Sequence, residues 1–185
     1  MPLLITGLAL WALAHWFKRF APAQRARLGE PGKGLVAVLL VGSVVLMVLG
    51  YRGADFIAVW TPPTWAVHLN NLLMIFAFWV YGSSAAKGAK AWPAYKLRHP
   101  QLVGFKIWAA AHLLVNGDLA SILLFGGLLA WAVVTVILIN RGDPDWTAPD
   151  PAGTKTYVRL GVITVVLVGL VTALHTWLGV WPFPS

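Results

Sequence analysis

The sequence predicts an all-α protein, a polytopic membrane helix bundle with six transmembrane helices and both termini on the outer, periplasmic side. Of its 185 residues, 59% are hydrophobic and only 11% are charged, and the mean hydropathy is +0.75. A soluble domain of this size has too little interior to bury so much apolar surface, whereas lipid solvates such surface in a membrane protein. The positive charges, moreover, gather between the apolar stretches rather than within them.

Six apolar stretches approach the length of about 20 residues that a bilayer crossing requires. No Lys or Arg precedes the first, so we expect a retained helix rather than a cleaved signal. The fourth is short and carries Lys106. After it, Gly117 suits a helix C-cap and Asp118 suits the N-cap of the fifth. The spans, which form one integral membrane domain over residues 1–185, are 3–20, 34–51, 65–86, 100–115, 119–140 and 157–180.

The charges of the loops predict the orientation of the bundle. The second and fourth loops contribute a single positive residue, Arg52, whereas the odd-numbered loops are basic. Positive loops stay in the cytoplasm, so the odd loops should face inward. This explains the net charge of +8 without a nucleic-acid partner. The positive residues of the odd loops are Lys18, Arg19, Arg25, Arg27 and Lys33 in the first, Lys87, Lys90, Lys96 and Arg98 in the third, and Arg141, Lys155 and Arg159 in the fifth.

The sequence lacks the motifs of several common catalytic and cofactor-binding sites. The chain has no cysteine, which excludes disulfides, iron–sulfur clusters, cysteine nucleophiles and a covalently attached haem. It also has no Gly-rich phosphate loop, no nucleophile elbow, no HExxH motif and no paired carboxylates within a span. Hydrolase and nucleotide-dependent functions therefore have no support.

The pattern Trp-Ala-x-Ala-His occurs twice in apolar stretches, ending at His15 and at His112. Each His shares a helix face with the Trp four residues before it, Trp11 and Trp108. Counted from opposite membrane faces at helical rise, the two histidines fall within ~6 Å of one depth. Two neutral imidazoles at one depth predict a non-covalent haem b with both as axial iron ligands. The alternative is that each His hydrogen-bonds a neighbouring helix.

Other polar residues are secondary candidates. Trp11 and Trp108 are expected to pack on the porphyrin, and Asn116, one turn beyond His112, to close the pocket. Lys106 either snorkels to the interface or, with Arg98, pairs with a haem propionate. Asp118 is expected either to cap a helix or to handle protons. The remaining candidates are His99, which shares a face with Lys106, and His68 and His175, a possible second pair at a shallower level.

Longer segments resemble the NnrU family. The resemblance rests on residues 99–121, on Trp60-Thr61-Pro62-Pro63 with His68, and on Phe125-Gly126 leading to Ala130-Trp131-Ala132. It implies a multi-pass protein of the bacterial inner (cytoplasmic) membrane, linked to nitrite and nitric oxide metabolism in denitrifying bacteria.

The family's relatives include the 15-cis-zeta-carotene isomerases, which are haem b proteins that isomerise a carotenoid double bond. By this resemblance their two ligand histidines correspond to His15 and His112. The isomerases also carry a cysteine three residues before the second ligand, where this chain has Ala109. An isomerase mechanism that needs that thiolate is therefore in doubt here.

Three functions remain in competition. The first is a membrane haem b protein with a redox or nitrogen-oxide role, served by a redox partner. The second is a haem-dependent cis-trans isomerase of an apolar polyene. The third is a transporter or assembly factor without enzymatic activity, in which histidines join helices or carry protons. The sequence favours the first.

Overall fold

The computed structural model describes residues 1–183 and is helical, which confirms the all-α class. Within these residues there is no β-strand, only two isolated bridges. The α6, η1 and α7 segments run on as one continuous helix over residues 119–142, in which η1 is a π-helical turn. The elements are α1 (Pro2–Phe20), α2 (Pro22–Arg27), α3 (Pro31–Arg52), α4 (Ala66–Gly82), α5 (Pro100–Val115), α6 (Leu119–Ser121), η1 (Ile122–Gly126), α7 (Gly127–Gly142) and α8 (Thr154–Trp177).

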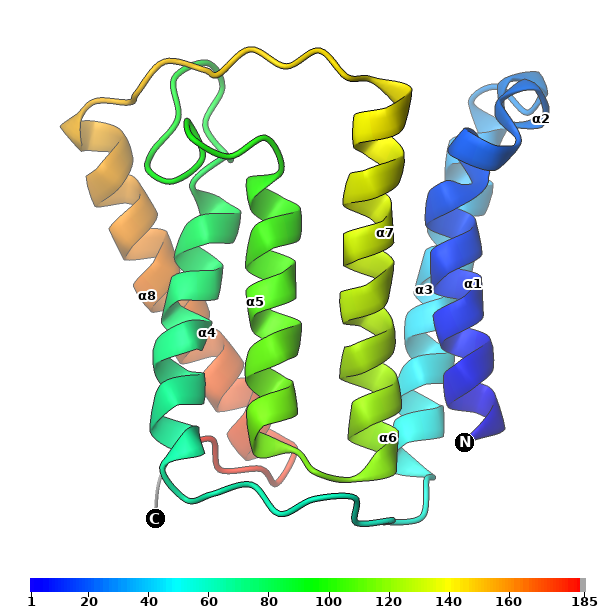
Figure 1. Cartoon of the computed structure of the whole chain (residues 1–185), viewed down its shortest axis with the longest axis vertical. Coiled ribbons are helices and arrows are strands. Elements are labelled where there is room, and N and C mark those ends of the chain that lie inside the picture. The colour runs from blue at the N-terminus through cyan, green and yellow to red at the C-terminus, as the bar shows by residue number, and fades with distance from the viewer. Residues whose placement is uncertain (184–185) are drawn as a thin grey trace.

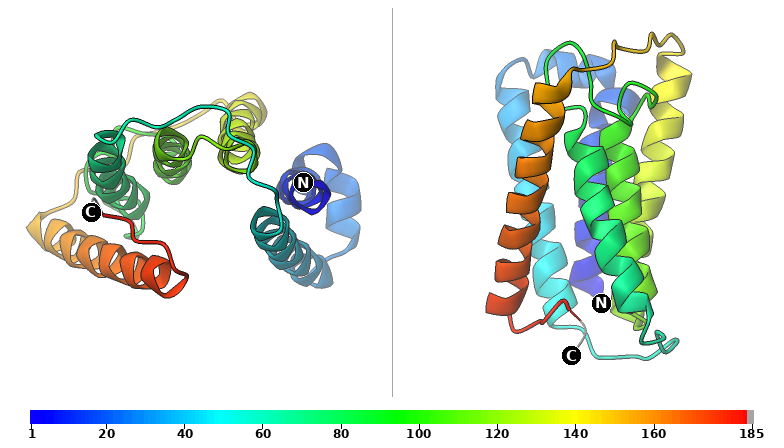
Figure 2. Two further views of the ribbon diagram at one scale, coloured as in Figure 1. Left: turned by 90° about the horizontal axis from the view of Figure 1, so that it is seen from below. Right: turned by 90° about the vertical axis from the view of Figure 1, so that its left-hand side faces the viewer.

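The long helices stand side by side in a curved row (Figure 1). Seen from below, the row is an open arc in the order α8, α4, α5, α7, α1, α3 (Figure 2). The contacts agree with this order, because α4 packs on α5 and α8, α7 packs on α5 and α1, and α3 packs on α1. The helices α3 and α8 therefore form the two ends of the arc, each attached chiefly through one neighbour.

Glycines set the closest helix contacts. A Cβ on Gly50 of α3 would lie 2.2 Å from the backbone nitrogen of Leu4 in α1. A Cβ on Gly104 of α5 would lie 2.8 Å from the carbonyl oxygen of Ala77 in α4. Helices in lipid gain no hydrophobic driving force from each other, so close approach through small residues supplies much of their attraction.

Three helices are long and apolar enough to cross a bilayer, namely α3, the continuous helix over 119–142, and α8. They overlap the predicted spans 34–51, 119–140 and 157–180, although α8 ends at Trp177 rather than at residue 180. The other three predicted spans are also helical, but α1, α4 and α5 have only 19, 17 and 16 residues. The third span ends at Gly82 rather than at residue 86, and the last turn of α1 carries the charged residues Lys18 and Arg19. Within residues 1–183 the helices are those of a membrane protein with three clear candidate spans, and six spans are not clearly shown.

The connections alternate between the two ends of the bundle (Figure 1). The basic connections α1–α3, α4–α5 and α7–α8 lie together at the upper end, which is called the basic end below. The start of α1 and the end of α8 lie at the opposite, lower end. This alternation agrees with the one that the charges predict, while its direction relative to a membrane stays a prediction.

The turn between α5 and α6 differs in part from the prediction. Asp118 is the N-cap of α6, and its Oδ1 accepts a hydrogen bond from the Ser121 backbone N–H at 2.9 Å, as expected. The C-cap of α5 is Asn116 rather than Gly117. Gly117 is instead needed for a close approach, because a Cβ there would lie 1.9 Å from the Trp60 carbonyl oxygen. Its own carbonyl accepts the backbone N–H groups of Val59 and Trp60 at 2.8 and 3.0 Å.

Candidate functional site

The two copies of the repeated pentapeptide have the same local geometry. The His15 Nδ1 donates to the Trp11 carbonyl at 2.9 Å, and the His112 Nδ1 donates to the Trp108 carbonyl at 2.9 Å. Each imidazole also packs on the indole of that same Trp, with ring centroids 4.2 Å apart in the first copy and 5.1 Å apart in the second. Both interactions join positions i and i+4 of one helix, so the pentapeptide is sufficient to produce them.

This hydrogen bond fixes the state of the ring. A carbonyl oxygen can only accept, so Nδ1 must carry the proton, and Nε2 of the neutral ring then presents its lone pair. His175 on α8 repeats the arrangement, because its Nδ1 lies 2.8 Å from the Val171 carbonyl. Within residues 1–183, none of these three Nε2 atoms takes part in a hydrogen bond. A metal-ligating histidine is typically held this way, by a bond from its other ring nitrogen.

Aromatic rings connect His15 with His112. From His15 the contacts run to Trp131, then to Phe105 and on to Trp108, with ring centroids 4.7, 5.3 and 5.0 Å apart. Trp108 in turn lies 5.1 Å from His112. These rings come from α1, α5 and α7, so the cluster fills the middle of the arc and separates the two imidazoles.

The two imidazoles also lie at different levels. His15 contacts Trp131, whereas His112 stacks on Phe125 with centroids 4.6 Å apart. Those partners are six residues apart on one continuous helix, which corresponds to about 9 Å along its axis. The shared depth that the sequence predicts is not found. That prediction assumed a core about 30 Å thick, whereas α5 has only 16 residues and His112 lies three residues before its end. The assignment of both residues as ligands of one iron stays a prediction.

Two buried indole groups beside His15 have no acceptor within residues 1–183. They are the Nε1 atoms of Trp11 and Trp131, whose rings lie 5.2 Å apart. Buried donors are nearly always hydrogen-bonded, so unpaired ones are unusual and point to a site. Trp131, which the sequence analysis used only for the family resemblance, thus lies between the repeated segments.

A pocket opens beside His112, between α4, α5 and α8. His175 lines the same pocket, and so does Asn70, which is 8% exposed and whose Oδ1 lacks a hydrogen-bond donor within the described residues. The Asn70 Nδ2 donates to the Asn71 Oδ1 at 3.0 Å, and the Asn71 Nδ2 donates to the Pro182 carbonyl at 3.0 Å. The pocket has a volume of about 90 Å³. Neither asparagine was among the residues predicted from the sequence. Two adjacent amide side chains in an apolar helix do, however, indicate a polar site inside the bundle.

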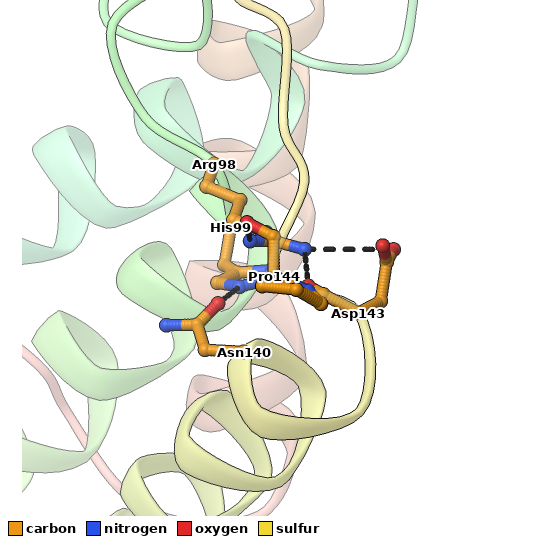
Figure 3. A network of polar contacts seen from close by, with 5 residues as sticks. All are labelled: Arg98, His99, Asn140, Asp143 and Pro144. Atoms are coloured by element: carbon orange, nitrogen blue, oxygen red, sulfur yellow. Dashed lines mark hydrogen bonds and ion pairs between the residues drawn. The ribbon is translucent and has the colours of Figure 1, made fainter.

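Arg98 and His99 lie at the basic end, at the start of α5, whereas the pocket lies beside His112 near the end of α5. Figure 3 shows their polar contacts with the end of α7 and the loop that follows it. The Arg98 guanidinium donates to the Pro144 carbonyl at 2.9 Å and also to the Asp143 carbonyl, and it lies 3.5 Å from the Asp143 carboxylate. The His99 Nε2 donates to the Asn140 Oδ1 at 2.7 Å. These bonds join the start of α5 to the end of α7. They give Arg98 and His99 a structural role and leave His112 about 20 Å away along α5.

The remaining candidates are scattered. Lys106 is half-buried on α5, without a hydrogen bond to any part of the chain described here. The Asn116 Nδ2 donates to the His112 carbonyl at 2.8 Å and so caps α5 instead of facing a ligand. Asp118 is held by Ser121, which also bonds the Tyr51 hydroxyl at 2.9 Å. His68 is exposed at the start of α4. His175, the partner predicted for His68 at a shallower level, instead lines the pocket beside His112.

The fold and these side chains define a class of protein, an all-helical membrane protein with histidines whose Nε2 atoms are free inside the bundle. A model of the family described as NnrU protein matches residues 3–182, nearly the whole chain. The chain therefore belongs to the NnrU family, as the sequence resemblance suggested. No match was found among curated proteins or among solved structures.

Proposed function

We propose that this NnrU-family protein binds haem b in the membrane and has a redox or nitrogen-oxide-related role. The observation that carries the proposal is the state of its histidines. His112 has its Nδ1 bonded within its own helix and its Nε2 free at the wall of a pocket. That is the state in which an imidazole coordinates iron.

The surrounding residues suit a haem better than a free metal ion. Within residues 1–183 no three His, Cys, Asp or Glu side chains stand close enough to hold a metal ion alone. Trp108 and Phe125 offer flat apolar faces beside His112. His112 would hold the iron, and the repeated pentapeptide predicts His15 as its partner. Binding of one iron by both would require the aromatic rings between the two imidazoles to rearrange. A bound haem supplies one-electron redox chemistry and, at an open axial position, a site for a diatomic gas.

The isomerase alternative is weaker in this chain. Ala109 occupies the position of the isomerase cysteine, and it is fully buried against neighbouring helices. The side chain there cannot supply a thiolate to iron. A redox or gas-binding role needs no such ligand, so it is the function that we propose.

We also propose that all six helices cross a bacterial inner membrane, with the basic end in the cytoplasm. The alternation of the loops supports this topology, and so does the concentration of positive charge at one end. Short helices such as α5 can cross where lipid thins locally or flanking side chains snorkel.

The test is an absorption spectrum of the detergent-purified full chain, oxidised and dithionite-reduced, with a pyridine haemochrome assay of haem content. We expect haem b in the wild type and its loss in His112→Ala. The matched control is His68→Ala, which removes an exposed imidazole and should keep the wild-type spectrum. A protein that stays colourless when expressed with a haem precursor would overturn the proposal.

A further inference from the structure

A second cavity opens at the basic end of the bundle, away from the histidines that the proposed function uses. It lies between the α4–α5 loop, the start of α5, the last turn of α7 and the α7–α8 loop, and its volume is about 430 Å³. Pockets that bind small molecules typically measure about 300–1,000 Å³. The cavity is therefore large enough for a ligand of that size.

Hydrogen bonds between the two loops hold the walls of this cavity together. The backbone N–H of Lys90 donates to the Asp150 carbonyl at 2.8 Å, and the Ala152 N–H donates to the Lys90 carbonyl at 2.8 Å. The Arg98 guanidinium adds the bond to the Pro144 carbonyl at 2.9 Å (Figure 3). The α4–α5 loop is thus joined to the α7–α8 loop at two places, so the cavity is formed before any ligand enters.

The charges around the cavity are positive. Lys90 and Arg98 line it, whereas no Asp or Glu side chain of residues 1–183 does. The Lys90 Nζ donates to the carbonyls of Ser84, at 3.0 Å, and of Ala86, which leaves its third N–H free. The Asp143 carboxylate lies 3.5 Å from Arg98, but it is 72% exposed and therefore offsets little of the charge.

The start of α5 adds backbone donors to these cations. The helix begins at Pro100 without a side-chain cap. The next two residues, Gln101 and Leu102, line the cavity, and their backbone N–H groups bond no carbonyl of the described chain. Free N–H groups at a helix N-terminus, together with the helix dipole, favour an anion. Cations and amide donors around one cavity are the combination that binds the oxygens of a phosphate.

We propose that this cavity binds a phosphate group, as the headgroup of an anionic membrane lipid or as free phosphate. The position of the cavity favours the lipid, because α4, α5 and α7 all end or begin there and helix ends lie at the level of the headgroups. Its lining also offers apolar side chains beside the cations, among them Leu97, Leu102 and Trp146. Basic pockets between membrane helices are typical sites for lipid headgroups. This inference does not depend on haem.

The experiment measures the midpoint of thermal unfolding of the detergent-purified full chain by circular dichroism. The probes are a soluble short-chain phosphatidylglycerol, the matching phosphatidylcholine and inorganic phosphate. A ligand of the folded state raises the midpoint with its concentration, which gives its dissociation constant. Lys90→Gln keeps a donor for the carbonyls but removes the charge, so the dissociation constant for phosphatidylglycerol should rise about tenfold or more. The matched control is Lys87→Gln, in the same loop but exposed and outside the lining, which should bind like the wild type.

A second variant tests the cavity from the side of α5. Gln101→Glu places a carboxylate among the free N–H groups, where it stabilises the helix but repels an anion, so the folded protein should lose the effect of phosphatidylglycerol. Inorganic phosphate that raises the midpoint and leaves phosphatidylglycerol no further effect supports the site with free phosphate as its ligand.

Two results would overturn the proposal. The first is an equal response to phosphatidylglycerol in Lys90→Gln, Gln101→Glu and Lys87→Gln, because the lipid then binds the basic surface at large. The second is a midpoint that neither phosphatidylglycerol nor inorganic phosphate changes more than phosphatidylcholine does. A wild type without haem would overturn the proposed function and leave both tests of this cavity intact.

Discussion

The contact between α1 and α3 makes a prediction about Gly50. Replacing Gly50 by Ala puts a Cβ 2.2 Å from the Leu4 backbone nitrogen and 2.7 Å from the Leu4 Cα. The first distance falls short of ordinary contact by about 1.2 Å. Both atoms belong to the backbone of α1, so no side-chain rotation relieves the clash and the two helices must move apart.

The expected cost follows from two opposing terms. Alanine in place of glycine favours a helix by up to about 1 kcal/mol. Overpacking of a close contact costs about 1–3 kcal/mol, and a backbone clash belongs at the upper end of that range. Gly50→Ala should therefore lower the free energy of unfolding by about 2 kcal/mol.

The control lies on the same helix. A Cβ on Gly42 of α3 would meet no atom within 4 Å, so Gly42→Ala should be neutral or stabilising. Both variants are unfolded with increasing sodium dodecyl sulfate in mixed micelles and followed by far-ultraviolet circular dichroism. Equal stability of Gly50→Ala and Gly42→Ala would refute the close contact of α1 with α3.

Three further predictions concern other parts of the bundle. Asp118→Ala removes the N-cap of α6 and should cost about 1 kcal/mol in the same titration, whereas Asp145→Ala in the exposed α7–α8 loop should change nothing. Thr135→Val leaves the Trp16 indole N–H without its acceptor at 2.9 Å and should lower the free energy of unfolding by roughly 0.5–1 kcal/mol. Its control is Thr176→Val, which should have no effect because that hydroxyl donates only to the Thr172 carbonyl on its own exposed helix. Because the chain has no cysteine, a single introduced Cys reports on which side of the membrane its loop lies. Asp55→Cys should react with a membrane-impermeant maleimide on intact spheroplasts, whereas Lys33→Cys should react only after lysis. The reverse pattern would contradict the predicted orientation.

The features that the sequence predicted well are local. The shared helix face of each His and the Trp four residues before it needs only one helix, although the bond from each imidazole to that Trp carbonyl was not predicted. The cap at Asp118 is equally local, because its partner is Ser121. Hydropathy likewise located the long helices and the short span of α5, although it did not show that α4 would end at Gly82.

The features that it missed depend on the order of helices. Nothing in the spacing of Asn70, His112 and His175 shows that α4, α5 and α8 are neighbours, so the pocket could not be predicted. The prediction that His15 and His112 share one depth was wrong, because their depths were counted from opposite faces of a bilayer of one assumed thickness. The short helix α5 does not have the length that this thickness requires. Arg98 was expected near a ligand, but the α7–α8 loop holds it through carbonyl groups that no charge pattern reveals.

The hydrogen bond between each imidazole and its own helix has a consequence for biogenesis. A ring oriented by a carbonyl one turn back needs no neighbouring helix to set its tautomer. The His112 ring is therefore oriented as soon as α5 has formed, before α8 has been synthesised. If the protein binds haem as proposed, uptake of the haem and closure of the bundle can thus occur in either order, because the tautomer of His112 is set within α5 rather than by the finished fold.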